Sequence, residues 1–350
     1  MKAAVFREYN KDPTKVVKIE DIDVPKIKPN EVLIKVESSA YNYNDLWAIW
    51  GEPVKTPLPH ISGSDVAGNV VEVGEDVTKF KVGDRVVSHS NMSCRICEMC
   101  TSGREYDCKY RTIWGFQTGP LWGGFAQYTH LPEVNVALLP ENVSFDDASA
   151  ISMVGMTAWH MLVGRAKIKP GQSVLIMGGT SGVGMVGIQI AKLYNCNVIA
   201  TAGNQQKMDK CLELGADSVV NHREPDWYKK VRDMTKKDGG VDIVFEHIGK
   251  NVFPQEVSLL KMGGTLVATG ATTGYDSTID LRFLFFKGTN LLGSTQGTKE
   301  ELEQVIFWVN KGKLKPLIST TLPFSNMAEG HVMMAGAEQI GKIMTTPQKL

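Results

Sequence analysis

The chain has 350 residues, and at that length two domains are expected rather than one core. Apolar residues make up 43% and charged residues 22%, as in an ordinary globular enzyme. Lys+Arg and Asp+Glu both number 38, so no net charge attracts the chain to nucleic acid or an anionic membrane. The sequence has neither the apolar stretch of a signal peptide nor a membrane-spanning run. We therefore expect a cytoplasmic protein with neither nucleic acid nor membrane as a partner.

The first 145 residues are predicted to be mostly β-structure. Short strands are expected at Glu31–Glu37, Asp65–Val73 and Arg85–Ser88, with turns between them and few segments of helical length. This pattern favours a partly open barrel.

Four cysteines lie close together between residues 94 and 108. Cys94, Cys97, Cys100 and Cys108 supply four thiolates, which is the ligand set of a tetrahedral zinc site. Four sulfur ligands leave no position for water or substrate, so one structural Zn²⁺ per chain is expected. The alternative is four reduced, metal-free cysteines.

Strand and helix patterns alternate from about residue 146 to residue 280. Ser144 is expected to cap a helix over Ala148–Leu162, with Asp147 as the capping-box acid. The elements expected after it are strands at Ser173–Met177, Asn197–Thr201, Ser218–Asn221, Asp242–Glu246 and Thr265–Thr269, and helices at Gly184–Leu193 and Lys207–Leu214. Such alternation predicts an α/β domain with a parallel sheet. Residues from about 280 to 350 are expected to return to the first domain, with Met1 as a strand partner.

A glycine-rich turn joins the first strand of this α/β domain to its helix. Glycines there let the backbone approach a pyrophosphate, whose charge meets the helix N-terminal amides. The cofactor residues expected in the turn are Gly179, Thr180, Gly182, Val183 and Gly184. At the ends of later strands, where ligands bind in such sheets, they are His247, Thr269 and Gly270. A satisfied structural histidine is the alternative for His247.

The end of the second strand of the α/β domain indicates which dinucleotide is bound. NAD sites usually place an acid there for the ribose hydroxyls, whereas this chain has Thr201-Ala-Gly-Asn204 with Lys207 just beyond. A 2′-phosphate would meet no repulsion and would pair with Lys207, so NADPH is favoured. An exposed helix lysine is the alternative.

The glycine-rich turn, the four-cysteine lobe and the domain order resemble the medium-chain dehydrogenase/reductase superfamily. The resemblance implies a Rossmann NADPH-binding domain at 146–280 and a GroES-like catalytic domain formed by 1–145 and about 280–350. Alcohol dehydrogenases of that superfamily hold a catalytic zinc with two cysteines and a histidine. The matching positions here are Asn42, Ser64 and Met153, which are poor zinc ligands. Catalytic zinc is therefore not expected.

Several loop segments resemble one branch of the superfamily, the crotonyl-CoA carboxylase/reductases and acryloyl-CoA reductases. The segments are Asn42-Tyr-Asn-Asp-Leu-Trp47, His60-Ile-Ser-Gly-Ser-Asp65, Ile113-Trp-Gly-Phe-Gln-Thr118, Gly124-Phe-Ala-Gln127, Asp242-Ile-Val-Phe-Glu-His247, Gly270-Ala-Thr-Thr-Gly274 and Asp280-Leu-Arg282. Carboxylating members use a glutamate and a histidine where this chain has Gln117 and Thr295. The resemblance implies an NADPH-dependent reductase of the C=C bond of acryloyl-CoA or crotonyl-CoA that protonates its intermediate without efficient carboxylation.

The same resemblance implies the substrate site. The catalytic residues expected are Asn42, Asn44, Phe116, Gln117 and Thr295, and Arg282 is expected to bind a coenzyme A phosphate, with help from Lys287. The structural alternatives are turn-forming asparagines, a buried aromatic side chain, a Ser-Thr turn and a surface ion pair of Arg282. An acyl-CoA substrate and a homodimer or homotetramer are the expected partners. A zinc-independent quinone oxidoreductase and a non-catalytic NADPH-binding protein remain alternative functions.

Overall fold

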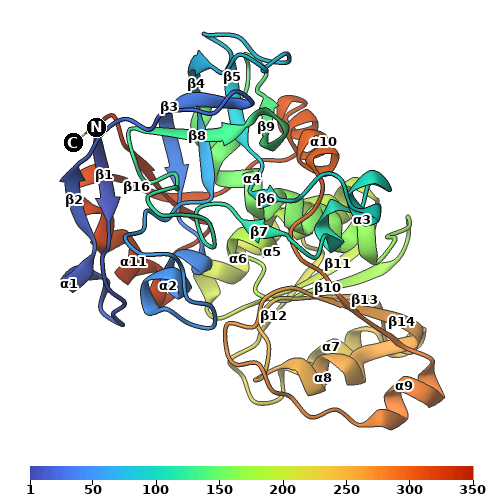
Figure 1. The fold of residues 1–350 in the computed structure, drawn as a ribbon. Coiled ribbons are helices and arrows are strands. Elements are labelled where there is room, and N and C mark those ends of the chain that lie inside the picture. The colour runs from blue at the N-terminus through green and yellow to red at the C-terminus, as the bar shows by residue number, and fades with distance from the viewer. Residues whose placement is uncertain (350) are drawn as a thin grey trace. The chain divides into compact units, whose positions relative to one another are not determined.

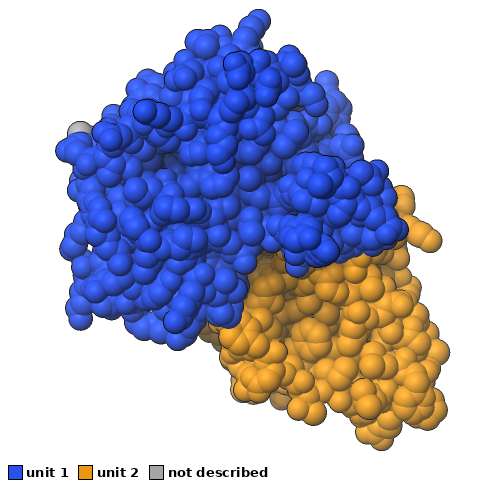
Figure 2. Space-filling model, in the orientation of Figure 1, with its two compact units in different colours: residues 1–153, 298–350 blue, residues 154–297 orange. Residues whose placement is uncertain are grey.

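The computed structural model describes residues 1–349, which divide into two compact units (Figure 2). One unit comprises residues 1–153 and 298–350, and the other comprises residues 154–297. These bounds differ from the expected ones at 145 and 280. The bound expected at 280 differs because strand β15 (Asn290–Gly293) pairs in parallel with β14 (Leu260–Ala268) and so belongs to the second unit. None of the described helices is long and apolar enough to cross a membrane.

The first unit is built on a seven-stranded sheet, as expected for a mostly β domain (Figure 1). Its strands run in the order β16-β17-β3-β4-β5-β9, and β8 also pairs with β3. Their bounds are β3 Glu31–Ala40, β4 Asp65–Val73, β5 Arg85–Ser88, β8 Tyr128–Pro132, β9 Val136–Leu138, β16 Ile318–Pro323 and β17 Lys342–Thr346. Two small sheets pair β1 (Lys2–Val5) with β2 (Lys18–Asp21) and β6 (Asn91–Met92) with β7 (Thr112–Ile113).

The last residues of the chain return to this unit as expected, but Met1 is not their partner. Strand β17 pairs antiparallel with β3, whereas β1 begins after Met1 and pairs with β2. The amino group of Met1 donates a hydrogen bond to the carbonyl of Ile22 at 2.7 Å. The expectation for Met1 was wrong because the segment Lys18–Asp21, closer in sequence, takes the edge of β1.

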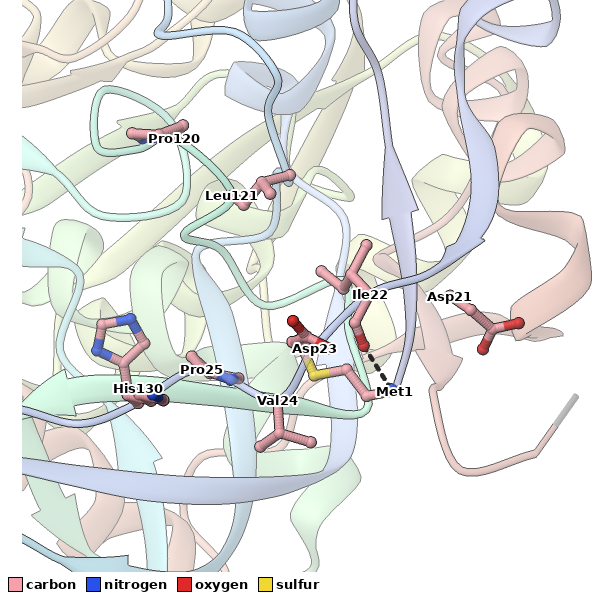
Figure 3. Close-up of a pocket in the computed structure, with 10 residues that line it drawn as sticks. Met1, Asp21, Ile22, Asp23, Val24, Pro25, Pro120, Leu121 and His130 are labelled. Carbon is pink, nitrogen blue, oxygen red and sulfur yellow. Dashed lines mark hydrogen bonds between the residues drawn. The ribbon is translucent and has the colours of Figure 1, made fainter.

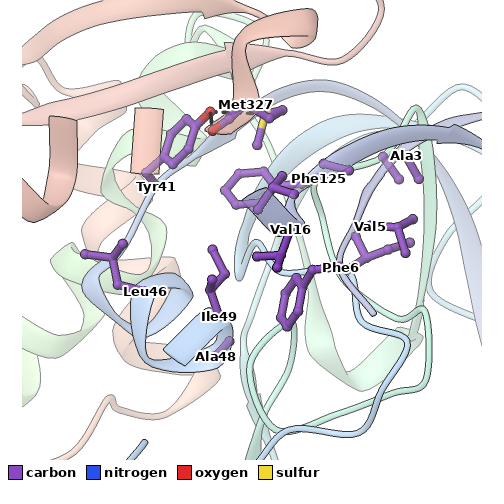
Figure 4. Packing of buried hydrophobic residues seen from close by; sticks show 14 of the residues in the cluster. Ala3, Val5, Phe6, Val16, Tyr41, Leu46, Ala48, Ile49, Phe125 and Met327 are labelled. Atoms are coloured by element: carbon purple, nitrogen blue, oxygen red, sulfur yellow. Dashed lines mark hydrogen bonds between the residues drawn. The ribbon is translucent and has the colours of Figure 1, made fainter. Parts of the chain in front are cut away.

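Helices of the first unit pack around an apolar cluster at the end of β3 (Figure 4). Tyr41, Leu46, Ile49, Phe125 and Phe324 are fully buried there. Burial of each such side chain stabilises the fold by about 1.5–3 kcal/mol, and this fixes the backbone on either side of residue 42. The helices that contribute residues to this cluster are α1 Pro13–Val16, α2 Tyr43–Trp50 and α11 Met327–Gly336. The unit also contains α3 Glu98–Thr101 and α10 Lys299–Asn310, with 3-10 turns at Glu105–Asp107, Glu133–Asn135 and Phe324–Asn326.

Helix α4 (Phe145–Trp159) is the expected capped helix. Ser144 Oγ accepts the Asp147 N–H at 3.0 Å and donates to the Asp147 carboxylate at 2.9 Å. The chain then continues as a π-helical turn over His160–Arg165, which the apolar periodicity does not distinguish from an α-helix.

The second unit is a six-stranded parallel sheet in the order β12-β11-β10-β13-β14-β15, so the expected α/β fold is confirmed. Its remaining strands are β10 Ser173–Ile176, β11 Asn197–Ala202, β12 Ser218–Asn221 and β13 Val241–Glu246. Its helices are α5 Gly182–Leu193, α6 Gln205–Glu213, α7 Trp227–Met234, α8 Phe253–Leu259 and α9 Leu281–Lys287, with a 3-10 turn at Lys236–Asp238. The carboxyl ends of the parallel strands meet at one edge, where the glycine-rich turn also lies.

Candidate functional site

Asn42 and Asn44 lie where β3 passes into α2, and both are buried, with 7% of their surface exposed. Asn42 caps the helix, and its backbone N–H donates to Asp45 Oδ2 at 2.7 Å. The two side chains have different partners: Asn42 Nδ2 donates to Asp65 Oδ2 at 2.8 Å, and Asn44 Nδ2 donates to Ser64 Oγ at 3.1 Å. Asn44 Oδ1 is buried without a partner among residues 1–349. The two asparagines are therefore more than turn formers.

A buried ion pair lies beside Asn42. The Lys342 ammonium is 3.0 Å from Asp65 Oδ2 and donates to Asn42 Oδ1 at 2.6 Å. The other carboxylate oxygen of Asp65 accepts from Ser152 Oγ at 2.6 Å and from the Met153 backbone N–H at 2.9 Å. Sequence reasoning missed Lys342, because a lysine near the end of the chain has the pattern of a solvent-facing residue.

Asp45 is a second buried carboxyl group in this polar cluster. Burial raises the pKa of Asp45 to about 7, although N–H groups of Asn42 and Gly63 donate to it and the Lys342 charge lowers its pKa. Burial therefore moves the pKa of this carboxyl group toward neutral pH.

Two of the other expected catalytic residues lie in one turn of the first unit. Phe116 is 4% exposed and packs with Trp47, with 6.4 Å between ring centroids. Gln117 is hydrogen-bonded to its near neighbour Ile113. Its side-chain Oε1 accepts the Ile113 N–H at 2.9 Å, and its backbone N–H donates to the Ile113 carbonyl at 2.7 Å. The side-chain carbonyl of Gln117 therefore closes a turn.

Thr295 follows β15 in the second unit and is half-buried. Its neighbour Gln296 is 5% exposed and has a φ of 31°, a conformation that side chains rarely adopt. Neither amide atom of Gln296 has a partner within the described chain. Such an unsatisfied and strained residue is typical of a functional site, and the sequence carries no signal for it.

The glycine-rich turn has the geometry of a pyrophosphate site. Gly178 has a φ of 55°, and a Cβ on Gly184 would lie 2.2 Å from the Gly178 carbonyl, so the turn requires glycine at both positions. Ser181 caps α5 by accepting the Gly184 N–H at 2.9 Å. Thr180, Gly182 and Val183 belong to the same turn.

His247 supports this turn from behind. Its Nε2 lies 2.8 Å from the Met177 carbonyl and 3.1 Å from Ser181 Oγ. Burial lowers the pKa of His247. These contacts are those of a hydrogen-bonded structural histidine, which was the alternative for His247. Thr269 and Gly270 follow β14 at the same edge of the sheet, where the Thr269 N–H donates to the Glu246 carbonyl at 2.9 Å.

Basic side chains surround Gly203 at the end of β11. A Cβ on Gly203 would lie 3.0 Å from Arg223 Nε and 3.5 Å from His222 Nε2. Burial, together with the charges of Arg223 and Lys207, lowers the pKa of His222 to about 4, so Lys207 belongs to the same cluster. His222 and Arg223 follow the predicted strand Ser218–Asn221, so their position at the ligand-binding edge was a signal that sequence reasoning overlooked.

A cavity of about 390 Å³ adjoins this basic cluster within the second unit. Its wall combines basic and polar residues with apolar ones: His222, Arg223, Glu224, Pro225, Trp227, Ile248, Asn251, Val252, Gln255 and Thr273. A lining of both polar and apolar side chains suits the adenosine half of a dinucleotide.

The four expected cysteine ligands lie together. Their sulfur atoms all lie within 4.8 Å of one another, and three of the distances are 3.5 Å (Cys97–Cys100), 3.6 Å (Cys94–Cys108) and 3.9 Å (Cys94–Cys100). Ligands at about 2.3 Å in a tetrahedron around zinc would be about 3.8 Å apart. The cluster therefore fits a closed structural zinc site.

Arg282 lies on the surface, with 74% of its side chain exposed, and pairs with Asp280 at 2.6 Å. This is the arrangement of the structural alternative for Arg282. Lys287 donates to the carbonyls of Ser258 and Leu260 at 3.0 and 2.6 Å. Neither Arg282 nor Lys287 lines either of the two cavities described in this section.

A larger surface cavity, of about 770 Å³, lies in the first unit (Figure 3). Met1, Ile22, Val24, Leu121 and His130 are among its lining residues. None of the expected site residues lines it, and the ring of His130 is paired with buried Glu31 at 2.8 Å.

Comparisons with known proteins agree with this arrangement. Residues 28–141 match the alcohol dehydrogenase GroES-like domain, and residues 182–311 match the zinc-binding dehydrogenase family. The crotonyl-CoA carboxylase/reductase of Cereibacter sphaeroides is 31% identical over 95% of this chain and 83% of that protein. Among solved structures, an NAD-dependent alcohol dehydrogenase is 38% identical with a TM-score of 0.93, covering 99% of both chains.

The crotonyl-CoA carboxylase/reductase AntE in complex with NADP is also similar, with a TM-score of 0.91 and 26% identity over 99% of this chain and 94% of that one. Both domain families, the order of the domains and identity above 30% along most of a curated relative point the same way. The chain belongs to the medium-chain dehydrogenase/reductase superfamily and is an oxidoreductase with enoyl-CoA reductase relatives.

Proposed function

We propose that this protein catalyses NADPH-dependent reduction of the C=C bond of a short-chain 2-enoyl-CoA, either acryloyl-CoA or crotonyl-CoA. One observation carries the proposal: an internal network with Asp65 and Lys342 holds Asn42, the residue that the resemblance matches to a zinc ligand of alcohol dehydrogenases. That network offers hydrogen-bond donors instead of a Lewis acid. Donors suit the oxygen of a thioester that gathers negative charge during conjugate reduction.

In this proposal, NADPH supplies a hydride to the β-carbon when it is bound. The second Nδ2 hydrogen of Asn42 and the amide of Asn44 are the groups that stabilise the developing enolate oxygen. A proton from water or a weak acid then completes the reduction at the α-carbon. Phe116 supplies an apolar wall.

We also propose that the intermediate is protonated without efficient carboxylation. Gln117 Oε1 is used by the Ile113 N–H, so Gln117 lacks both the charge and the free acceptor of the glutamate in carboxylating relatives. Thr295 lacks the titratable ring of the histidine. Neither side chain reproduces a water-mediated clamp for CO₂.

NADPH is proposed over NADH on the strength of the basic cluster. Arg223, His222 and Lys207 surround Gly203, where an NAD site would place an acid. The NADP in the AntE complex supports this choice, whereas the NAD-dependent relative opposes it. Gly179, Thr180, Gly182, Val183, Gly184, Thr269 and Gly270 are proposed to contact the cofactor, and His247 to hold the turn.

One structural zinc per chain is proposed for Cys94, Cys97, Cys100 and Cys108. The support is the spacing of their sulfur atoms and the chemistry of four thiolates. The zinc holds the lobe together and takes no part in the reduction.

The proposed partners are an acyl-CoA and further copies of this chain. Arg282 would contact a coenzyme A phosphate by leaving Asp280, which costs little because an exposed ion pair is worth about 0–1 kcal/mol. A homodimer or homotetramer is proposed because Leu281, Phe285 and Phe286 of α9 are 64–68% exposed and α9 directly precedes the edge strand β15.

The test is NADPH oxidation against a panel of 2-enoyl-CoA thioesters, quinones and aldehydes. Turnover of acryloyl-CoA or crotonyl-CoA above all others is expected. Faster turnover of quinones would establish the quinone oxidoreductase alternative, and NADPH binding without turnover would establish a non-catalytic protein. Mass analysis of the product formed with bicarbonate and carbonic anhydrase present should find the saturated, uncarboxylated thioester. A mainly carboxylated product would refute the assignment of Gln117 and Thr295.

A further inference from the structure

Lys342 is the most deeply buried cation whose partners the structure describes, with 3% of its side chain exposed. Its two hydrogen-bond acceptors are Asn42 Oδ1 at 2.6 Å and Asp65 Oδ2 at 3.0 Å. Burying an ammonium is costly unless it is paired and hydrogen-bonded. Asp65 neutralises the charge of Lys342, so the shorter hydrogen bond to Asn42 is not needed for charge balance.

The chemistry of the ammonium fixes the orientation of the Asn42 amide. An ammonium group only donates hydrogen bonds and a carboxylate only accepts them, so Oδ1 must face Lys342 and Nδ2 must face Asp65. Rotating the amide by half a turn would set NH₂ against NH₃⁺ and a carbonyl against a carboxylate. Asn42 is therefore left with one Nδ2 hydrogen to offer.

Asp65 cannot move to relax this arrangement. Its other oxygen accepts from Ser152 Oγ at 2.6 Å and from the Met153 N–H at 2.9 Å. Asp65 is fully buried, and Lys342 is 2% exposed. The ion pair therefore forms a fixed frame for the amide.

Asn44 has no comparable frame. Its Nδ2 contacts Ser64 Oγ at 3.1 Å, and a hydroxyl group both donates and accepts. The Asn44 amide can therefore contact Ser64 in either orientation, and its other atom stays without a partner among residues 1–349. Lys342 distinguishes the two asparagines, because it fixes one as a donor and leaves the other adaptable.

We propose that Lys342 is a positioning residue that holds the amide of Asn42 as a hydrogen-bond donor toward the oxygen on which negative charge develops. The inference rests on the proposed enoyl thioester reduction, in which that oxygen belongs to the thioester. A donor fixed before the reaction costs no reorganisation when the charge appears. Its loss should therefore lower kcat with little change in KM.

Three variants separate orientation from charge balance. Lys342→Met removes the ammonium and leaves the Asp65 charge buried. Lys342→Met/Asp65→Asn removes both charges, so folding stability should return to about that of the parent. The amide of Asn42 still lacks the hydrogen bond from the Lys342 ammonium. Lys35→Met is the matched control, because Lys35 lies on the neighbouring strand β3 and forms only a partly exposed ion pair with Glu37 at 3.3 Å.

Steady-state kinetics with crotonyl-CoA and thermal unfolding should be measured for each. The double variant is expected to unfold within a few degrees of the parent, with kcat about 10- to 100-fold lower and KM within threefold. The Lys35→Met protein should match the parent. Recovery of kcat together with stability in the double variant would show that Lys342 only balances the charge of Asp65, and the proposal would be overturned.

A second measurement needs no substrate and so separates this proposal from the proposed function. In ¹⁵N-asparagine-labelled protein, the Nδ2 hydrogens of Asn42 can be assigned by their loss in Asn42→Asp. They should exchange slowly with solvent in the parent and at least tenfold faster in the double variant. Equal exchange would overturn the positioning role. Slow exchange in a parent that reduces no enoyl-CoA would refute the proposed function alone.

Discussion

A carboxylate at position 203 should reverse the cofactor preference. In Gly203→Asp the new Cβ would lie 3.0 Å from Arg223 Nε and 3.5 Å from His222 Nε2, both at the ends of side chains that are able to shift. The backbone of Gly203 is not in the left-handed region, so a side chain is tolerated. The aspartate would pair with Arg223 in place of a 2′-phosphate and would be available to the ribose hydroxyls of NADH.

The expected size of the effect follows from two contributions. Loss of the charged hydrogen bonds from Arg223 to the phosphate costs about 1.5–3 kcal/mol. Because Arg223 is exposed, repulsion between aspartate and phosphate at about 4 Å adds about 1 kcal/mol, the value for water. Together, about 3 kcal/mol weakens NADPH binding about 150-fold.

The assay is titration of both cofactors by the change in protein fluorescence. The control is Gly203→Asn, which has the same shape without the charge and should weaken NADPH binding less than tenfold without improving NADH binding. If Gly203→Asp lowered the affinity for both cofactors equally, the basic cluster would not be the 2′-phosphate site.

Three further predictions concern the rest of the chain. The purified protein should contain about one zinc per chain, and Cys108→Ser should lose it and unfold at least about 5 °C lower, as metal analysis and calorimetry would show; a zinc-free parent would contradict this. Burial, together with the charge of Glu246, raises the pKa of Glu256 well above its ordinary value of 4.5, so the folded state holds the proton more tightly and stability falls as the pH rises from about 4.5 toward the raised pKa. Glu256→Gln should remove that loss, at most about 1.4 kcal/mol per pH unit, in unfolding experiments between pH 5 and 8; an unchanged slope would show that another group titrates. Phe285→Asp should shift the protein to monomers in light scattering, whereas Val82→Asp, an equally exposed apolar position of the first unit, should not; a parent that is already monomeric would refute the role of α9.

Local sequence patterns predicted most of the fold. Strands with uninterrupted or alternating apolar residues were predicted with correct bounds at Asp65–Val73, Arg85–Ser88 and Ser218–Asn221. The ends of longer elements were less accurate: β3 continues to Ala40, and α4 passes into a π-helical turn. Element ends depend on packing that periodicity does not encode. The cytoplasmic location stays a prediction.

Site residues were predictable where one short segment supplies them. The four cysteines and the glycine-rich turn each lie within about fifteen residues, so spacing alone brings them together. Lys342 contacts Asn42 across 300 residues of sequence, and no local pattern marks such a pair. Gln117 illustrates the opposite case, because a local contact with Ile113 occupies a side chain that the resemblance assigned to the substrate pocket.

The discontinuous first unit has a consequence for biosynthesis. A ribosome releases the strands β3 and β4 long before β17, which pairs with β3 and carries Lys342. All residues of the second unit, 154–297, emerge in between. During translation Asp65 and Asn42 are therefore made before Lys342, their cationic partner. Strand β17, which carries Lys342, also adds the last pairing to the sheet. A nascent chain would acquire a cofactor-binding unit before it acquires a finished site for chemistry.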